Sequence, residues 1–172
     1  NQFSILMKNE MELMWSKKLG LKVFDNNLVE SLFTLMTLSK VDYTIFFRSL
    51  SEIPNNFSPI KKSFYQITTD EIDSLWISWL KKWRMSLDKS FSIEDLSKRM
   101  KRINPKYIWR EWLVVPAYEK AENGDYTLIK ELQKVFNNPY DEQSLEIEKK
   151  YDALMPRKYF NKGGISHYSC SS

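Results

Sequence analysis

Cys170 is the residue of this sequence with the most reactive side chain. It is the only cysteine, stands third from the carboxyl end and lies in the run Ser169–Ser172, where no neighbouring cation favours the thiolate. A thiol near a chain end is open to oxidants and can reach distant partners. Because the chain has one cysteine, it holds neither an internal disulfide nor a cysteine-based zinc site, and any disulfide from Cys170 must lead outside it.

His167, three residues before Cys170, is the only histidine. It is either a base towards the thiol, as in cysteine–histidine nucleophile pairs, or, by default, a solvated histidine. A single histidine excludes paired-histidine metal motifs. Composition alone also leaves open that Cys170 is an inert cysteine of the tail.

Motifs for phosphate binding or catalysis are missing from the rest of the sequence. The glycines, at positions 20, 124, 163 and 164, form no glycine-rich phosphate loop, and there is no Asp-Phe-Gly, His-Arg-Asp or Gly-x-Ser-x-Gly motif. The acidic residues fit solvated helical faces or first helical turns, so pairing two of them as acid and base is arbitrary. We therefore expect no catalytic, cofactor-binding or metal-binding residue in this chain.

The elements that must position these side chains are predicted to be helices. Hydrophobic residues recur at helical spacing throughout, which predicts an all-α fold, a compact bundle of about seven or eight helices with an irregular carboxy-terminal tail. Residues 4–18 form the first helix, and Asp25 and Asp42 are N-caps of the next two.

Three tryptophans lie on one stripe of a further helix. Thr68 and Glu71 are spaced as a capping box that opens this helix, and Trp76, Trp79 and Trp83 follow at core spacing. We interpret the stripe as core, with a stacking platform for nucleic-acid bases as the alternative.

The stretch from Asn104 to Gln143 is predicted to be the centre of the fold. Asn104-Pro105 is read as a cap followed by proline at the first helical position, and the helix to Ala121 is apolar on nearly every face. A helix of that kind is buried within its domain. Asn123-Gly124 ends it, and a second helix follows to complete an αα-hairpin. Pro116 predicts a kink in the first arm.

Length and composition indicate one folded domain. The chain has 172 residues, of which 42% are hydrophobic and 15% aromatic, enough to bury a core and too apolar for general disorder. We expect a helical domain over residues 1–154 and a flexible tail over residues 155–172 that carries Cys170. Since the first residue is Asn rather than Met, we expect a piece of a longer protein.

The charge pattern indicates neither a nucleic-acid partner nor a membrane partner. The net charge is +4, and basic and acidic residues are interspersed. The cationic runs at 81–84 and 98–102 fall at helix ends, where the helix dipole favours cations. No apolar run approaches the ~18 residues that a spanning helix needs.

Four motifs stand in a fixed order in the second half of the chain. They are Asn104-Pro105-Lys106-Tyr107-Ile108-x-Arg110, Ala121-Glu122-x-Gly124-Asp125, Asn138-Pro139-Tyr140-Asp141-Glu142-Gln143 and Ser169-Cys170-Ser171-Ser172. Two shorter runs precede them, Lys-Leu-Gly-Leu at 18–21 and Asp-Tyr-Thr followed by Phe-Arg-x-Leu at 42–50. Together they resemble the carboxy-terminal region of the selenoprotein O family, and the last motif is similar to the terminal Cys- or selenocysteine-Ser-Ser signature of that family.

The resemblance implies an enzyme whose chemistry lies outside this chain. Members of that family are pseudokinases that act as protein adenylyltransferases, binding ATP in an inverted orientation with a divalent metal, Mg²⁺ or Mn²⁺. The nucleotide-binding and metal-binding residues belong to a kinase-like domain, which would lie upstream of Asn1. That domain and the protein substrates are the implied partners. The implied location is intracellular, mitochondrial in a eukaryote and cytoplasmic in a bacterium.

The resemblance also assigns roles to residues of this chain. It implies that Cys170 is a redox switch that bridges to a cysteine of the kinase-like domain. Asp42, Arg48 and Arg110 are candidates for contacts with that domain, and the alternative for Asp42 and Arg48 is a helix cap and a surface ion pair. The alternative function is a non-catalytic helical module that binds a peptide or RNA in a groove lined by exposed aromatic side chains.

Overall fold

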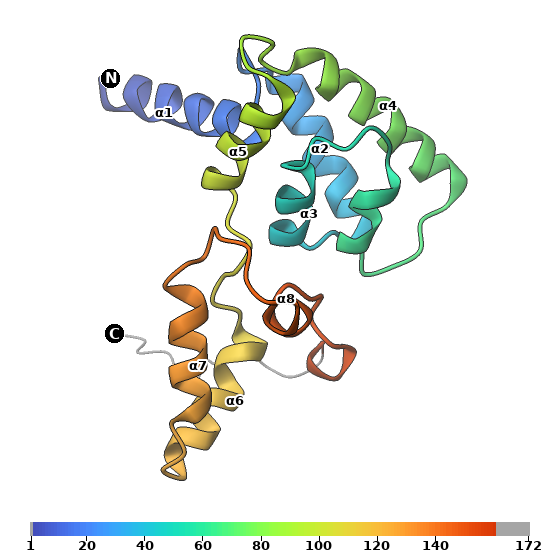
Figure 1. Ribbon diagram of the computed structural model, residues 1–172. Helices are drawn as coiled ribbons and strands as arrows, with labels where there is room; N and C mark the ends of the chain where they lie inside the picture. The colour runs from blue at the N-terminus through green and yellow to red at the C-terminus, as the bar shows by residue number, and fades with distance from the viewer. Residues whose placement is uncertain (1, 161–172) are drawn as a thin grey trace. The chain divides into compact units, whose positions relative to one another are not determined.

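The computed structural model describes residues 2–160, and that part of the chain is built from helices, without a β-strand (Figure 1). The all-α prediction is confirmed, and the eight α-helices of the described part match the expected number. They are α1 Gln2–Leu19, α2 Asn26–Ser39, α3 Tyr43–Leu50, α4 Asp70–Ser86, α5 Ile93–Ile103, α6 Glu111–Glu122, α7 Thr127–Phe136 and α8 Leu145–Tyr151, with the short 3-10 helices η1 Ser58–Ser63 and η2 Arg157–Tyr159.

The helices form two compact units, and the expected helical domain over residues 1–154 stays a prediction. Residues 1–105 make the first unit and residues 106–172 the second, so the division falls between Pro105 and Lys106. Each unit has its own cluster of buried apolar side chains. The boundary between domain and tail at residue 154 stays a prediction.

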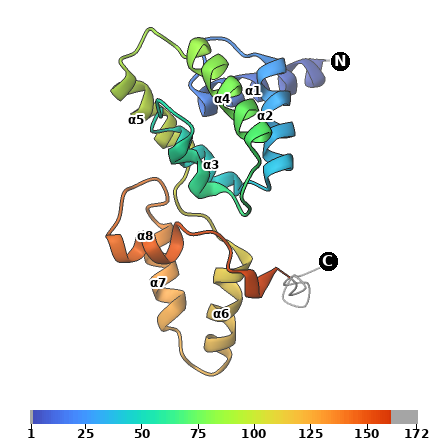
Figure 2. The same ribbon diagram turned by 90° about the vertical axis from the view of Figure 1, so that its right-hand side faces the viewer.

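Helix α4 lies along α2 in both views and packs one face into the core of the first unit (Figures 1 and 2). Trp76, Trp79 and Trp83 are buried on its inner face, as the core interpretation predicted. The rings of Trp79 and Trp83 stack, with centroids 6.1 Å apart and planes at 5°. Because all three indoles are buried, they offer no platform for stacking bases.

Each indole also donates a hydrogen bond, which satisfies the one polar atom that a buried tryptophan carries. The acceptors lie on α1 and α2, so the three bonds fix α4 to two other helices. They run from Trp76 Nε1 to Ser39 Oγ (2.8 Å), from Trp79 Nε1 to the Leu28 carbonyl (3.0 Å) and from Trp83 Nε1 to the Leu19 carbonyl (2.8 Å).

The predicted N-caps Asp25 and Asp42 are confirmed, and the N-cap predicted for α4 is displaced by one residue. Asp25 caps α2 by accepting from the Leu28 N–H at 3.0 Å. At α4 the N-cap is Thr69, whereas Thr68 donates its hydroxyl proton to Asp73 instead. The predicted capping box of Thr68 and Glu71 is therefore wrong by one residue, because the local carboxylate of Asp73 competes for Thr68.

The predicted central helix from Pro105 to Ala121 is wrong in both its start and its place. Residues 105–110 form no helix, and the N–H groups of Lys106 and Tyr107 donate to the Pro139 carbonyl, at 2.7 and 3.1 Å, which pairs this segment with the turn after α7. Helix α6 begins only at Glu111 and buries a narrow face of Leu113, Val114 and Ala117. Among the helices of the first unit, α3 has the largest buried share, from Thr44 to Leu50.

Helices α6 and α7 pack as the predicted αα-hairpin of the second unit, and α8 completes it (Figure 2). The buried Lys106 ammonium is paired with Glu142 and, at 2.6 Å, with Glu148, which joins the start of this unit to the segment around α8. Pro116 lies inside α6. A kink there stays a prediction.

Candidate functional site

Asp42, one of the predicted contact residues, is the N-cap of α3. One carboxylate oxygen accepts from the Ile45 N–H at 3.0 Å, and the other accepts from the Tyr65 hydroxyl at 2.9 Å. The side chain is buried, with 7% of the residue exposed. The cap interpretation is confirmed, and a contact with an upstream domain stays a prediction.

Arg48 lies on α3 and is buried, with 4% exposed, so the surface position weighed for it is wrong. Its Nη1 donates to the carbonyls of Lys101 (3.1 Å) and Asn104 (3.2 Å), at the end of α5. The last carbonyls of a helix have no partner within the helix, and the guanidinium supplies donors for them. Arg48 thus joins α3 to α5 within the first unit.

Arg110 lies in the second unit, immediately before α6. Its Nη1 donates to the Ala153 carbonyl at 3.4 Å, which ties the start of α6 to the segment after α8. The three predicted contact residues are therefore divided between the units. Asp42, as the N-cap of α3, and Arg48, within α3, belong to the first unit, whereas Arg110 belongs to the second unit.

A buried polar cluster that sequence reasoning missed lies at the end of α1. Asn104 Oδ1 accepts from Lys18 Nζ at 2.8 Å, and Asn104 Nδ2 donates to the Lys18 carbonyl and to Ser51 Oγ, both at 2.9 Å. The Lys18 ammonium also lies over the rings of Phe47 and Tyr43, 4.3 and 5.0 Å from their centroids. Burial lowers the pKa of Lys18 to about 8.

This cluster, formed by Lys18, Asn104 and Ser51, joins the ends of three helices. Its polar atoms bond one another, so it is a structural junction and not an open reaction site. Nothing local announced it, because Lys18 reads as an exposed cation of a last helical turn and Asn104 reads as an N-cap. The cluster depends on the contact between Lys18 and Asn104, which are 86 positions apart, and no local sequence pattern records such a contact.

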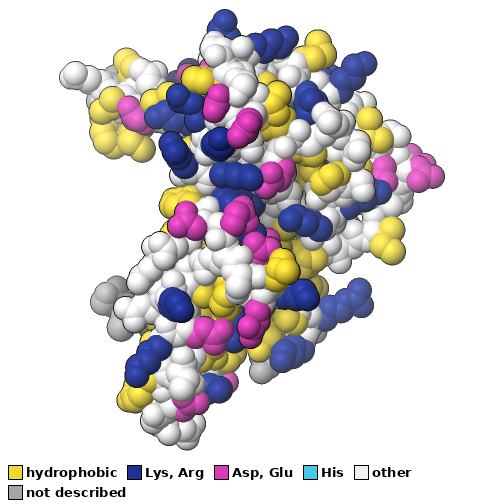
Figure 3. Space-filling view, in the orientation of Figure 1, with side chains coloured by type: hydrophobic (Ala, Val, Ile, Leu, Met, Phe, Trp, Pro, Cys, Tyr) yellow, Lys and Arg dark blue, Asp and Glu magenta, His cyan; other side chains and the backbone are white. Residues whose placement is uncertain are grey.

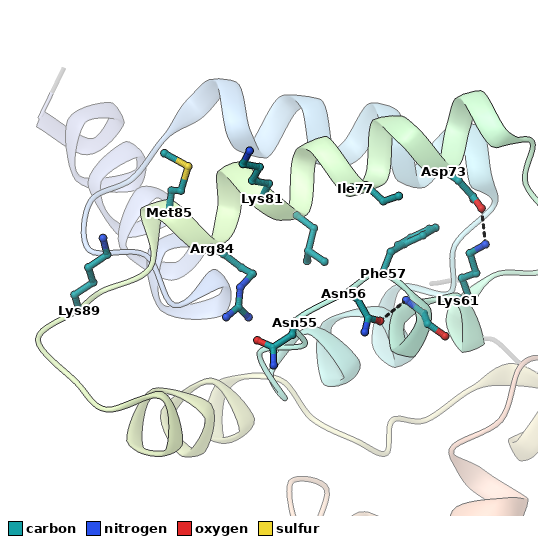
Figure 4. Close-up of a pocket in the computed structure, with 12 residues that line it drawn as sticks. Asn55, Asn56, Phe57, Lys61, Asp73, Ile77, Lys81, Arg84, Met85 and Lys89 are labelled. Carbon is teal, nitrogen blue, oxygen red and sulfur yellow. Dashed lines mark hydrogen bonds and ion pairs between the residues drawn. The ribbon is translucent and has the colours of Figure 1, made fainter.

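A hollow in the first unit lies between α4 and the loop before η1 (Figure 4). Its volume is about 880 Å³, and four cations line it together with one carboxylate. That carboxylate, Asp73, is paired with Lys61, whose hydrogen bond lowers its pKa. The side chains of the lining are Asn55, Asn56, Phe57, Ser58, Lys61, Asp73, Ile77, Leu80, Lys81, Arg84, Met85 and Lys89.

Arg84 fixes one wall of this hollow. Its Nη1 donates to the carbonyls of Ile53 (2.9 Å) and Pro54 (2.8 Å). Ile53 has a φ of 49°, a left-handed conformation that a β-branched residue rarely adopts, and the bond from Arg84 holds it there. The lining is cationic and apolar, and it pairs no nucleophile with a base.

A second hollow of the first unit lies beside α1 and has a volume of about 660 Å³. Four cations, Lys17, Lys22, Arg99 and Arg102, stand around an apolar floor that includes Leu13, Val23, Phe91 and Ile103. Asp88 is the one carboxylate that lines it. The Arg99 guanidinium lies 3.9 Å from the centroid of the Phe91 ring, which fixes this cation on the apolar wall.

Chemistry of other kinds is sparse in the described part of the chain. Residues 2–160 contain no group of three or more histidine, cysteine, aspartate or glutamate side chains that could hold a metal ion. Among the same residues, no helix is both long and apolar enough to span a membrane. Cys170, the predicted redox residue, and His167 lie outside the described residues.

Comparison with curated proteins finds relatives that are much longer than this chain. The protein nucleotidyltransferase YdiU of Aromatoleum aromaticum is 32% identical over 99% of this chain and 34% of its own length. The protein of the same name from Flavobacterium johnsoniae is 34% identical over 92% of the chain and 32% of its length. For Vibrio parahaemolyticus the identity is 32%, over 100% of the chain and 35% of the relative.

The chain thus spans about a third of the length of the curated relatives that it matches. A family model described as protein adenylyltransferase SelO matches residues 1–137, which include all of the first unit and the α6–α7 hairpin. That range and the three relatives confirm the resemblance found in the sequence motifs. The chain belongs to the SelO family of protein adenylyltransferases.

Proposed function

We propose that this chain is the carboxy-terminal helical part of a longer protein adenylyltransferase. The observation that carries the proposal is the family match over residues 1–137, together with relatives named as nucleotidyltransferases that are about three times as long. In the proposed reaction a protein hydroxyl oxygen attacks the α-phosphorus of ATP. The bond to the β-phosphate breaks, so AMP is attached to the protein and pyrophosphate leaves.

The proposal assigns the reaction to the part of the polypeptide that this chain lacks. ATP and its Mg²⁺ or Mn²⁺ ion would bind in a kinase-like domain, and the two helical units would support that domain. The substrates would be proteins with accessible hydroxyl side chains. The location would be cytoplasmic if the protein is bacterial, as the compared relatives are, and mitochondrial if it is eukaryotic.

Radiolabelled ATP tests the reaction directly. The longer polypeptide is incubated with Mg²⁺ or Mn²⁺ and acceptor proteins, in parallel with ATP labelled at the α-phosphate and ATP labelled at the γ-phosphate. Adenylyl transfer puts only the α-label on protein. Label from the γ-phosphate would show phosphoryl transfer and would contradict the proposal.

Cys170 is proposed to regulate that reaction through a disulfide with a cysteine of the remaining polypeptide. Two thiols would lose two protons and two electrons to a disulfide oxidant such as oxidised glutathione, and one S–S bond would form. In the Cys170→Ser variant, we expect AMP transfer to be equal under oxidised and reduced glutathione. Ser171→Ala is the matched control and keeps the redox response; a response that persists in Cys170→Ser would exclude the switch.

The alternative function, a non-catalytic module for a peptide or RNA, draws little support from the structure. It relied on exposed tryptophans, and the stripe on α4 is buried. Trp109 alone among the six tryptophans is largely exposed, at 59%. A single exposed indole makes no stacking platform for successive bases.

A further inference from the structure

Helix α1 exposes most of its large apolar side chains. Among the residues of α1, only Lys18 and Leu19, at its carboxyl end, are buried. The remaining length carries seven large apolar residues that are each between 41% and 68% exposed. They are Phe3, Ile5, Leu6, Met7, Met11, Leu13 and Met14. Figure 3 shows these hydrophobic side chains gathered over the free part of α1, with cationic side chains next to them.

These residues cover more than one face of the helix. Phe3, Met7, Met11 and Met14 recur at a spacing of three or four and form one stripe, whereas Ile5 falls on another side. A helix that is apolar on several faces is normally buried within a larger structure. A membrane-surface helix instead needs a separate polar face, which the scattered polar residues of α1 do not form.

The apolar surface continues into the smaller hollow beside α1. Leu13 belongs to both, and Val23 and Ile103 extend the apolar floor. Lys17, Lys22, Arg99 and Arg102 surround that floor, against the single carboxylate of Asp88. We call the seven exposed apolar residues of α1 and this hollow the α1 surface; it is apolar in the middle and cationic at one border.

We propose that the α1 surface docks against the remainder of the longer polypeptide, through an apolar face of that remainder bordered by carboxylates. The inference rests on the proposed function in one respect, that the chain is part of a longer protein. Relatives about three times as long supply the chain length for such a partner. A second copy of this chain would bind less favourably, because its four cations would face the four cations of the first copy and repel them.

Methionine oxidation tests the docking with controls that the chain already contains. Met7, Met11 and Met14 report on the α1 surface, Met85 is an exposed control at 69%, and Met100 is a buried control at 0%. Susceptibility to oxidation follows exposure. Dilute hydrogen peroxide is applied to the 172-residue chain and to the longer polypeptide, and the sulfoxide at each site is followed by mass spectrometry.

In the 172-residue chain the three α1 methionines should oxidise at the rate of Met85. In the longer polypeptide they should react about tenfold more slowly, while Met85 stays fast and Met100 stays slow in both samples. Equal rates in the two samples would overturn the proposal. Protection that appears in the 172-residue chain and grows with its concentration would assign the surface to a second copy and would overturn it too.

A charge reversal tests the cationic border in the longer polypeptide. Arg99→Glu with Arg102→Glu should restore at least half of the oxidation rate of the α1 methionines. Lys81→Glu with Lys89→Glu makes the same charge change at the other hollow and should leave the protection intact. Slow oxidation of Met100 shows that each variant is folded. If the oxidation rate of Met100 rises in the doubly charge-reversed variant, Arg99→Gln with Arg102→Gln is used in its place. Unchanged protection of the α1 methionines in a folded variant argues against the carboxylate border.

The outcome is separable from that of the proposed function. Protection of the α1 methionines requires only that the two parts of the polypeptide dock, whether or not AMP is transferred. Conversely, an active enzyme with fully oxidisable α1 methionines would retain the proposed function and remove this inference.

Discussion

Lys18 places an ammonium group inside the first unit, where it donates to the amide oxygen of Asn104 and lies over two aromatic rings. Burial opposes the charged form of a lysine, so its pKa falls from 10.5 to about 8. The cost of keeping this charge buried depends on pH. Lys18 therefore makes the stability of the unit pH-dependent above neutrality.

We predict that the free energy of unfolding of the first unit rises as the pH increases from about 8 towards 10.5. In that window the unfolded chain still binds the proton and the folded chain releases it, so folding is favoured. Lys18→Met should flatten this rise, whereas Lys17→Met, an exposed neighbour, should retain it. Urea unfolding followed by tryptophan fluorescence at several pH values up to 9.5 measures the slope.

Tyr43, which lies against Lys18, does not titrate below pH 9.5, because burial raises its pKa from 10.0. An equal slope in Lys18→Met and the unchanged chain would mean that another group causes the pH dependence.

Asn104 is predicted to be among the most costly residues of the first unit to shorten. Asn104→Ala removes three bonds at once and leaves the Lys18 ammonium buried without its acceptor, at a cost of about 3 kcal/mol. Asn26→Ala removes one exposed bond, to Glu30, and should cost less than about 0.5 kcal/mol. Urea midpoints of the two variants that coincide would show that the cluster is not a junction.

Helix ends show how the same local motif has different energies in different surroundings. Gly20 and Gly124 both follow a helix and both have positive φ, at 67° and 80°. A Cβ on Gly20 would come within 2.7 Å of the sulfur of buried Met100, whereas a Cβ on Gly124 would meet nothing within 4 Å. Only Gly20 combines backbone strain with a crowded neighbour.

We therefore predict that Gly20→Ala destabilises its unit more than Gly124→Ala destabilises the other. Strain alone costs Gly124→Ala about 1 kcal/mol, and the clash with Met100 raises the cost of Gly20→Ala to about 2–4 kcal/mol. Thermal unfolding of both variants by circular dichroism gives the comparison. Equal losses would mean that the Met100 side chain moves aside freely.

The buried stripe of α4 predicts the tryptophan fluorescence of the chain. Iodide should quench only a minor part of the emission, because Trp76, Trp79 and Trp83 are buried and Trp109 is the one largely exposed indole. Trp109→Phe should remove most of the quenchable part, and Trp83→Phe should leave it in place. Strong quenching that survives Trp109→Phe would favour the alternative of an exposed aromatic groove.

At the scale of the whole molecule, the family assignment predicts what this chain cannot do alone. The 172-residue chain should show no saturable binding of ATP at micromolar concentration in a calorimetric titration with Mg²⁺. The longer polypeptide should bind ATP under the same conditions. Micromolar binding by the short chain would place the nucleotide site in the present residues and would contradict the proposed division of labour.

The sequence by itself determined the features that depend on neighbours along the chain. Helical periodicity, the Asp25 and Asp42 caps and the tryptophan stripe are local patterns, and they predicted the all-α fold and the indole core of α4. Ordered motifs likewise identified the family, because they record residue types and spacing.

Only the tertiary structure decided the features that depend on residues far apart. Lys18 and Asn104 meet across 86 positions, and the Pro139 carbonyl accepts hydrogen bonds from the N–H groups of Lys106 and Tyr107, in a segment that forms no helix. The first unit ends at Pro105, and Lys18, which reads as exposed from the sequence, is buried within it. The physical reason is that burial and hydrogen-bond competition are set by which distant segments meet, and periodicity contains no record of that choice.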